Sequence, residues 1–192
     1  MWDWINWKEE LSQKHLLFIN FPNTNGKVNI KWGKDFPELV EDTKFTIDSI
    51  NASSKKKILV GHDWGCFYSY LLDQKYPQFF DEMIMMDVPG KIQLKSIKEI
   101  IYVVIYQMVL ITAFLVGGPI GKFLTQSSMK VFKHNPPYAS SVNSSQNYPY
   151  YYLWRNSLLS ALKMKTKYLS KYTPSVPTTY LYGANKPFQF HG

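Results

Sequence analysis

An acidic residue between two glycines is the strongest chemical signal in this sequence. Asp63 lies two residues after Gly61 and two before Gly65, in the stretch 58–68, ILVGHDWGCFY. The apolar run at 58–60 predicts a buried strand, and the residues after Gly65 predict a helix. A sharp turn of this kind presents one reactive side chain at the edge of a sheet. The sequence therefore predicts that Asp63 is a nucleophile.

A carboxylate nucleophile implies a particular chemistry. It can attack an sp3 carbon that carries a leaving group and form an ester on the enzyme. The backbone N–H of Trp64 would stabilise the oxyanion when that ester is hydrolysed, and its indole N–H could face a leaving anion. We expect glycine at 61 and 65 because a Cβ at either position would crowd the packing of strand and helix. The alternative is a glycine-rich turn in which Asp63 only caps the helix.

The motif Gly61-His62-Asp63-Trp64-Gly65 resembles the nucleophile elbow of the α/β-hydrolase superfamily, in its epoxide hydrolase and haloalkane dehalogenase branch. The segments 76–77, 83–89 and 176–190 are similar to the same branch. The resemblance implies a hydrolase that acts on a small apolar substrate through Asp63 and an alkyl-enzyme ester, with no cofactor and no metal.

The same resemblance implies a partial α/β-hydrolase fold with a mostly parallel sheet and a helical lid insertion. Residues 1–90 would form the N-terminal part of the core with the elbow, 91–172 the helical lid, and 173–192 the return strand and loop of the core.

Aromatic residues late in the expected lid are candidates for substrate binding. In this branch, lid tyrosines donate a hydrogen bond to the substrate oxygen, and the second usually stands directly before Arg-Asn. Here Trp154 occupies that position, before Arg155, while Tyr151 and Tyr152 lie nearby. Together with Trp64, these three residues are the candidate substrate-binding set. Ordinary aromatic packing is the alternative for the tyrosines.

The other members of the expected triad are less complete. The family's acid usually follows the return strand, where this chain has Lys186. Asp87, after the previous strand, is the candidate acid, and a strand-end turn residue is its alternative role. His191 comes too early to be the triad histidine, and His62 lies inside the elbow. Two further histidines, His15 and His134, match nothing in the family.

The missing histidine affects the expected activity. Without a base to activate water, an ester on Asp63 would form but would not turn over. The alternative function is therefore a catalytically inactive α/β-hydrolase-like binding or membrane-surface protein. Since elements that the family places before the elbow are also absent, we expect the 192 residues to be a fragment of a longer protein.

Hydrophobic patterns predict the elements that position Asp63. Helices are expected at 3–13, 37–50 and 65–76, and strands at 15–21, 57–61, 83–86 and 178–182. This βαβ alternation favours a mostly parallel sheet. Residues 91–170 contain no clear strand. In a second alignment, residues 19–22 correspond to the family's oxyanion loop and not to the end of the strand at 15–21 and its turn.

A long apolar run at 100–121 contains no charged residue, and Lys95, Lys98 and Lys122 flank it. Its length suits a transmembrane helix, whereas its position between two strands of one sheet favours a buried lid helix. Gly117-Gly118-Pro119 should break the helix. Contact with a membrane surface is the third alternative.

Composition excludes some classes of protein. The net charge is +8, but the lysines are scattered and no nucleic-acid-binding motif occurs, so we expect no nucleic-acid partner. A single cysteine, Cys66, excludes an internal disulfide and is expected to pack behind the elbow. No signal peptide is visible, which favours an intracellular location, either cytoplasmic or membrane-associated.

Overall fold

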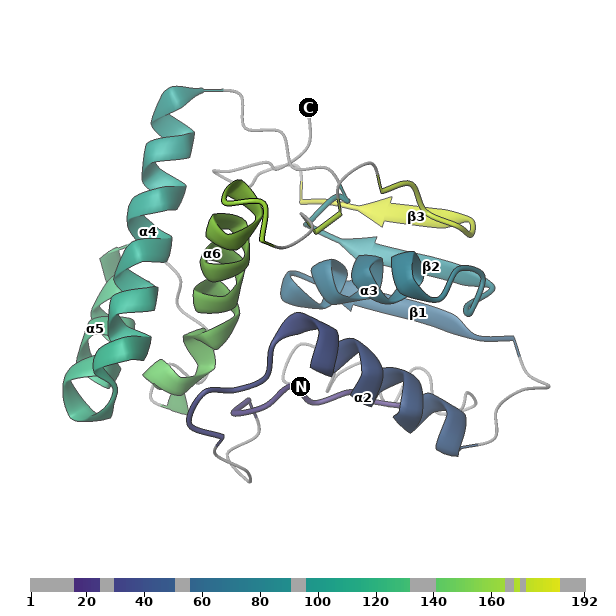
Figure 1. The fold of residues 1–192 in the computed structure, drawn as a ribbon, viewed down its shortest axis with the longest axis horizontal. Coiled ribbons are helices and arrows are strands. Elements are labelled where there is room, and N and C mark those ends of the chain that lie inside the picture. The colour runs from purple at the N-terminus through teal and green to yellow at the C-terminus, as the bar shows by residue number, and fades with distance from the viewer. Residues whose placement is uncertain are drawn as a thin grey trace.

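Three strands and six helices make up the described part of the chain. The computed structural model describes residues 16–24, 30–50, 56–90, 96–131, 141–164, 168–169 and 172–183. In chain order the elements are α2 (Phe36–Ser49), β1 (Ile58–His62), α3 (Trp64–Lys75), β2 (Glu82–Met86), α4 (Ile97–Val116), α5 (Gly118–Val131), the short 3-10 helix η3 (Ser144–Asn147), α6 (Tyr148–Ala161) and β3 (Thr178–Leu181) (Figure 1).

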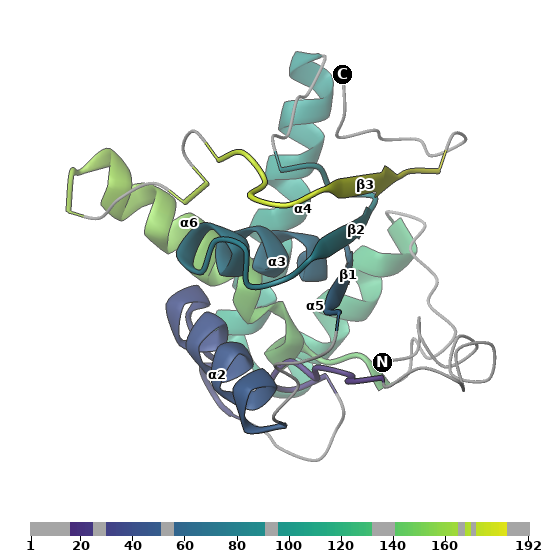
Figure 2. The ribbon, with the colours of Figure 1, turned by 90° about the vertical axis from the view of Figure 1, so that its right-hand side faces the viewer.

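The strands form a parallel sheet in the order β1-β2-β3. Val60 lies opposite Ile84, which lies opposite Thr179 in the next strand. Helix α3 connects β1 to β2 and packs beside the sheet, and α2 packs against α3 (Figure 2). This βαβ unit is the small parallel sheet with covering helices that the sequence predicts, and it positions the residues of the elbow.

The two faces of the sheet differ in burial. On the side of α3, Met83 and Met85 of β2 are fully buried and pack with Cys66. On the other side, Ile58, Val60 and Leu181 are exposed. The side chains alternate because successive residues of a strand point to opposite faces. The core of the described residues therefore lies between the sheet and the helices on the α3 side.

Helix α2 begins at Phe36, one residue before the start that the sequence predicts. The Asp35 side chain accepts a hydrogen bond from the Phe36 N–H at 2.7 Å, and the Glu38 side chain accepts one from the Asp35 N–H at 2.9 Å. The Asp35 side chain also accepts from the Glu38 N–H, which completes a capping box, and Pro37 fits the first turn, where no N–H is required. Phe36 is fully buried among the aromatic residues of α3, so the cap fixes α2 on the core.

Helices α4, α5 and α6 lie beyond the carboxyl ends of the strands (Figure 1). Gly117 ends α4 at φ 64°, and Gly118 starts α5 at φ 56°, so both occupy the left-handed region that favours glycine. A Cβ on Gly121 would lie 2.3 Å from the Ala113 carbonyl oxygen, which shows how closely the two helices pack. The predicted break at 117–119 is therefore confirmed.

A buried carboxylate anchors the segment that leads into β3. Asp73 of α3 is 1% exposed. It accepts hydrogen bonds from the Tyr172 hydroxyl at 2.7 Å, from the Ser175 N–H at 2.9 Å and from the Ser175 hydroxyl. A buried charge of this kind needs several donors. The three bonds tie residues about a hundred positions apart and place β3 beside β2.

One predicted strand is wrong within the described residues, which begin at Leu16. Residues 16–21 form no strand, and they end in a turn in which the Thr24 N–H donates to the Phe21 carbonyl at 3.2 Å. Phe21 instead packs its ring on Tyr68, with centroids 4.4 Å apart. An apolar run of strand length can be partly buried against helices as well as in a sheet, which is why the pattern misled. The helix expected at 3–13 lies outside the described residues.

Candidate functional site

Asp63 has the strained backbone of an elbow. It follows β1 directly, with φ 51° and ψ −118°, and α3 begins at the next residue. A non-glycine residue in this region costs of order 1–3 kcal/mol and persists only where its surroundings hold it. Here the Cys66 N–H donates to the Asp63 carbonyl at 3.0 Å. The Asp63 side chain makes no capping hydrogen bond to α3, so the capping alternative is wrong.

The two glycines of the motif differ in how much space a Cβ would have at each position. A Cβ on Gly61 would lie 3.0 Å from both the Cys66 backbone nitrogen and the Met85 sulfur. Strand and helix therefore approach so closely that only glycine fits without a shift. A Cβ on Gly65 would meet nothing within 4 Å. The expected crowding is confirmed at Gly61 and wrong at Gly65, which lies on the open side of the first turn of α3.

Cys66 packs behind the elbow, as the sequence predicts. It is fully buried, and its thiol donates a hydrogen bond to the Met86 carbonyl at 3.0 Å. Burial raises the pKa of the Cys66 thiol to about 11. Because the thiolate is the nucleophilic form of cysteine, this residue is a packing group.

Two tyrosines from separate helices come together next to Asp63. The ring of Tyr150 in α6 lies 5.0 Å from that of Trp64 and 5.9 Å from that of Tyr106 in α4. Burial raises the pKa of both hydroxyls, and the negative charge of Asp63 raises both further. A hydrogen bond joins the two hydroxyls, and it raises the pKa of Tyr150 and lowers that of Tyr106. Both tyrosines therefore stay protonated, as hydrogen-bond donors beside a carboxylate.

Tyr106 and Tyr150 are not among the site residues that the sequence predicts. Tyr106 lies inside the apolar run at 100–121, where a hydroxyl is unusual, and this was the available signal. Tyr150 directly precedes the two tyrosines that were selected. What the sequence could not provide is the pairing, because 44 residues separate the two positions and the contact depends on how α4 and α6 pack.

The three lid residues selected from the sequence lie in other contacts. The Tyr151 ring lies 5.5 Å from Phe114 and 6.0 Å from Trp32. Tyr152 lies 5.2 Å from Tyr151. The Trp154 indole N–H donates to the Gln107 side chain of α4 at 2.7 Å. These contacts join α6 to its neighbours, and a role in substrate binding for the three residues stays a prediction.

The candidate acid Asp87 is paired with His62. The Asp87 carboxylate lies 2.9 Å from His62 Nε2, and the Asp87 N–H donates to the Leu181 carbonyl at 2.9 Å. Asp87 itself has φ 73°, a region that aspartate tolerates better than most residues. The structure thus brings His62, the last residue of β1, next to Asp87, which directly follows β2. The role of Asp87 as the triad acid stays a prediction.

A polar cluster fixes the helix that carries Tyr150. The buried Asn156 side chain of α6 donates to Asp35 at 2.9 Å and to the Tyr168 hydroxyl at 3.0 Å. Arg155 adds an ion pair with Asp35 at 3.6 Å. The cap of α2 is therefore also the docking point of α6. Buried polar groups that are satisfied in this way hold one packing arrangement over others.

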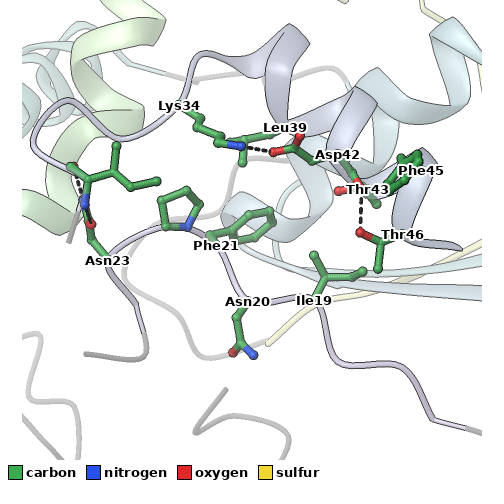
Figure 3. A pocket seen from close by; sticks show the side chains of 12 residues that line it. Ile19, Asn20, Phe21, Asn23, Lys34, Leu39, Asp42, Thr43, Phe45 and Thr46 are labelled. Atoms are coloured by element: carbon green, nitrogen blue, oxygen red, sulfur yellow. Dashed lines mark hydrogen bonds and ion pairs between the residues drawn. The ribbon is translucent and has the colours of Figure 1, made fainter. Parts of the chain in front are cut away.

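Asp63 is exposed, and two cavities lie elsewhere. One, of about 380 Å³, lies between residues 19–23 and α2, and the ion pair of Lys34 and Asp42 lies at its wall (Figure 3). The other, of about 430 Å³, lies where Trp32 and Phe114 meet the start of α5. Neither includes Asp63. Among the described residues, no group of three or more His, Cys, Asp and Glu side chains is arranged to hold a metal ion.

Comparison with known proteins supports the fold. No protein-family model matches the chain, and no curated protein matches it significantly. A solved structure described as a marine microorganism esterase is similar in fold, with a TM-score of 0.51 at 13% sequence identity. The alignment covers 95% of this chain and 82% of the esterase. At this identity the likeness concerns the fold, and it agrees with the hydrolase-like α/β fold that the sequence predicts.

Proposed function

We propose that the protein is an α/β-hydrolase in which Asp63 forms a covalent ester with a small apolar epoxide or alkyl halide. The observation that supports this proposal is the convergence of Tyr106 and Tyr150 on Asp63. A carboxylate on a strained strand-to-helix turn, faced by two protonated tyrosines from another part of the chain, combines a nucleophile with hydrogen-bond donors.

The first chemical step follows from this arrangement. An Asp63 carboxylate oxygen attacks one carbon of the epoxide ring, and the C–O bond on the far side breaks. Charge develops on the ring oxygen, which stays bonded to the second ring carbon, and the tyrosine hydroxyls donate hydrogen bonds to it. One tyrosine gives its proton to this oxygen, which becomes the hydroxyl of the ester product, and the tyrosine regains a proton from water. Fixed donors aimed at developing charge are usually the largest single contribution to catalysis. The raised pKa values keep Tyr106 and Tyr150 protonated for this role.

The proposed lid is the set of helices that supplies these donors. Helices α4 and α6 lie beyond the carboxyl ends of the strands, the edge where open α/β sheets usually bind ligands. Asn156 and Asp35 fix α6 on the core. Small movements of α4 relative to α6 would therefore open or close the space between Tyr106 and Asp63.

Covalent labelling tests the proposal at its first step. The chain is incubated with styrene oxide or a short alkyl bromide, and the intact mass and peptide masses are measured. We expect one adduct on the peptide that contains Asp63, and we expect Asp63→Asn to prevent it. Labelling needs no base for ester hydrolysis, so it reports the nucleophile alone. A protein that stays unmodified would contradict the proposal.

Tyrosine variants test the role of the donors, with a matched control in the same helix. Tyr106→Phe and Tyr150→Phe each remove one hydroxyl beside Asp63. We expect epoxide labelling to slow by about 100- to 1,000-fold, since one oxyanion donor is worth about 2.7–4 kcal/mol. Tyr148→Phe removes the hydroxyl of a buried core tyrosine at the start of α6 and should leave the rate unchanged. Equal rates in all three variants would assign the two tyrosines to packing.

The alternative is a catalytically inactive protein that uses the same fold for binding. The exposure of Asp63 favours this alternative, because a nucleophile in water loses the electrostatic advantage of a closed site. The labelling experiment separates the two functions. An inactive protein would give no adduct, yet Tyr106→Phe and Tyr150→Phe would still change the affinity for a small apolar ligand.

A further inference from the structure

We infer that α4 docks the protein onto the surface of an anionic lipid bilayer, lying parallel to the membrane. This inference does not depend on the proposed hydrolysis, since it rests on the outer side of α4 and not on Asp63. Among the described residues, α4 is the one helix that is long and apolar enough to cross a membrane, and little of it is buried in the protein.

Five of the exposed apolar residues of α4 form one stripe, which we call the α4 stripe, and Ile100 and Val116 are exposed on either side of it. It consists of Ile97, Ile101, Ile105, Met108 and Leu115, with exposed fractions from 37% for Met108 to 67% for Ile97. At 3.6 residues per turn these positions fall within about 80° of each other around the helix axis. The stripe is about 27 Å long, from the rise of 1.5 Å per residue. The expectation of a buried lid helix is therefore wrong for this side of α4.

The polarity of α4 is reversed relative to a helix on a water-facing surface. A surface helix normally turns its apolar side to the core and its polar side to solvent. In α4 two polar side chains face the protein: Tyr106 meets Tyr150, and Gln107 accepts a hydrogen bond from Trp154. Thr112 is the polar residue among the exposed side chains within the stripe. The branched apolar side chains face outward. This arrangement is unfavourable in water and becomes favourable where the outer medium is apolar.

Charges near the stripe match an anionic surface. Lys98 is exposed near the start of α4, and Lys122 is exposed just after its end, in α5. Glu99, the acidic residue in the first turn of α4, lies about 160° around the axis from the centre of the stripe. Each lysine near an anionic membrane surface contributes about 1 kcal/mol of attraction. One exposed lysine therefore lies near the start of the stripe, and a second follows its end in the next helix.

The position of the lysines also selects the orientation. In a helix that crosses the bilayer, the two ends lie on opposite sides, whereas both ends of a parallel helix meet headgroups on the same side. The helices on either side of the turn at Gly117 pack together along their length, and β2 and β3 belong to one sheet. A parallel position keeps the sheet and α5 on one side of the membrane, and it buries the stripe to the depth typical of interfacial helices.

Vesicle co-sedimentation tests the inference with the full 192-residue chain. The probes are phosphatidylcholine vesicles with and without phosphatidylserine, at low and high salt. We expect binding to the anionic vesicles that weakens with salt. The variant Ile101→Glu with Ile105→Glu should reduce the partition coefficient by about tenfold or more, and Lys98→Gln by about fivefold. Far-UV circular dichroism confirms that each variant keeps its helices.

Matched controls use exposed residues away from α4. Phe45 of α2 is 75% exposed, so Phe45→Glu removes a comparable apolar group from another helix and should leave vesicle binding unchanged. Lys56→Gln is the corresponding control for charge. Absence of binding at low salt would overturn the inference. An equal loss of vesicle binding in Phe45→Glu would also overturn the inference. A dimer in light scattering that dissociates in the double isoleucine variant would overturn it too, because the stripe would then bind a second copy of the chain.

Discussion

The strained backbone of Asp63 leads to a stability prediction that is independent of any activity. Asp63→Gly and Asp63→Ala both remove the carboxylate, and they differ only by a Cβ. At ordinary positions alanine is the more stabilising of the two, because glycine loses about 0.5–1 kcal/mol more conformational entropy on folding. At φ 51° and ψ −118° the Cβ is the source of the strain, so the order should reverse.

The expected size follows from two opposing contributions. Relief of the backbone strain favours glycine by about 1–3 kcal/mol, and the entropy of the unfolded chain opposes it by about 0.5–1 kcal/mol. We therefore expect Asp63→Gly to be more stable than Asp63→Ala by about 1–2 kcal/mol. In a chain of this length this corresponds to a difference of about 2–8 °C in melting temperature.

Urea unfolding followed by circular dichroism measures the difference, and α2 supplies a control of opposite sign. Asp42 lies in the middle of α2 and is exposed. There, Asp42→Gly should be less stable than Asp42→Ala by about 1 kcal/mol, as in any helix interior. If alanine were also the more stable residue at position 63, the elbow would carry no strain and the reasoning about Asp63 would be refuted.

Three further predictions concern packing and pH. A Cβ on Gly33 would lie 2.3 Å from the buried Tyr148 ring, at φ 63°, so Gly33→Ala should lower the free energy of unfolding by about 2–4 kcal/mol in urea titrations. Asn156→Ala removes the hydrogen bonds that join α6 to Asp35 and to the Tyr168 hydroxyl and should cost about 1–3 kcal/mol, with faster hydrogen exchange in α6; unchanged exchange would contradict this role. Burial raises the Cys66 pKa from 9.0 to about 11. Because the unfolded thiol ionises first, its contribution to stability is complete below pH 9 and is lost as the pH rises to about 11, a loss that Cys66→Ala should lack.

Local sequence signals predicted the elements around the elbow well. The helix predicted at 37–50 is α2 at Phe36–Ser49, and the helix predicted at 65–76 is α3, which ends at Lys75, two residues before Pro77. The glycine at 61 and the acid at 63 predicted a sharp turn that the backbone of Asp63 confirms. These features depend on a few neighbouring residues, whose dihedral angles and hydrogen bonds are fixed locally.

Features that depend on distant parts of the chain were predicted poorly. The segment 16–21 has the composition of a strand, but its surroundings are helices and a turn. The run at 100–121 has too few polar residues to show which face of the helix is exposed. Its composition therefore could not distinguish a helix buried in the protein from one with an exposed apolar face. The approach of Tyr106 to Tyr150 is a packing contact between two helices, and no local pattern encodes it.

The anchoring of β3 by Asp73 has a consequence for how this chain can vary. The three hydrogen bonds to Tyr172 and Ser175 close a loop that contains α4, α5 and α6, and they do so from residues outside those helices. The entropy of closing a long loop rises only slowly with its length, by about 0.6 kcal/mol for each doubling. Helices between β2 and β3 can therefore be lengthened, exchanged or reshaped by evolution, or by protein engineers, while the clamp on α3 continues to hold the sheet in register.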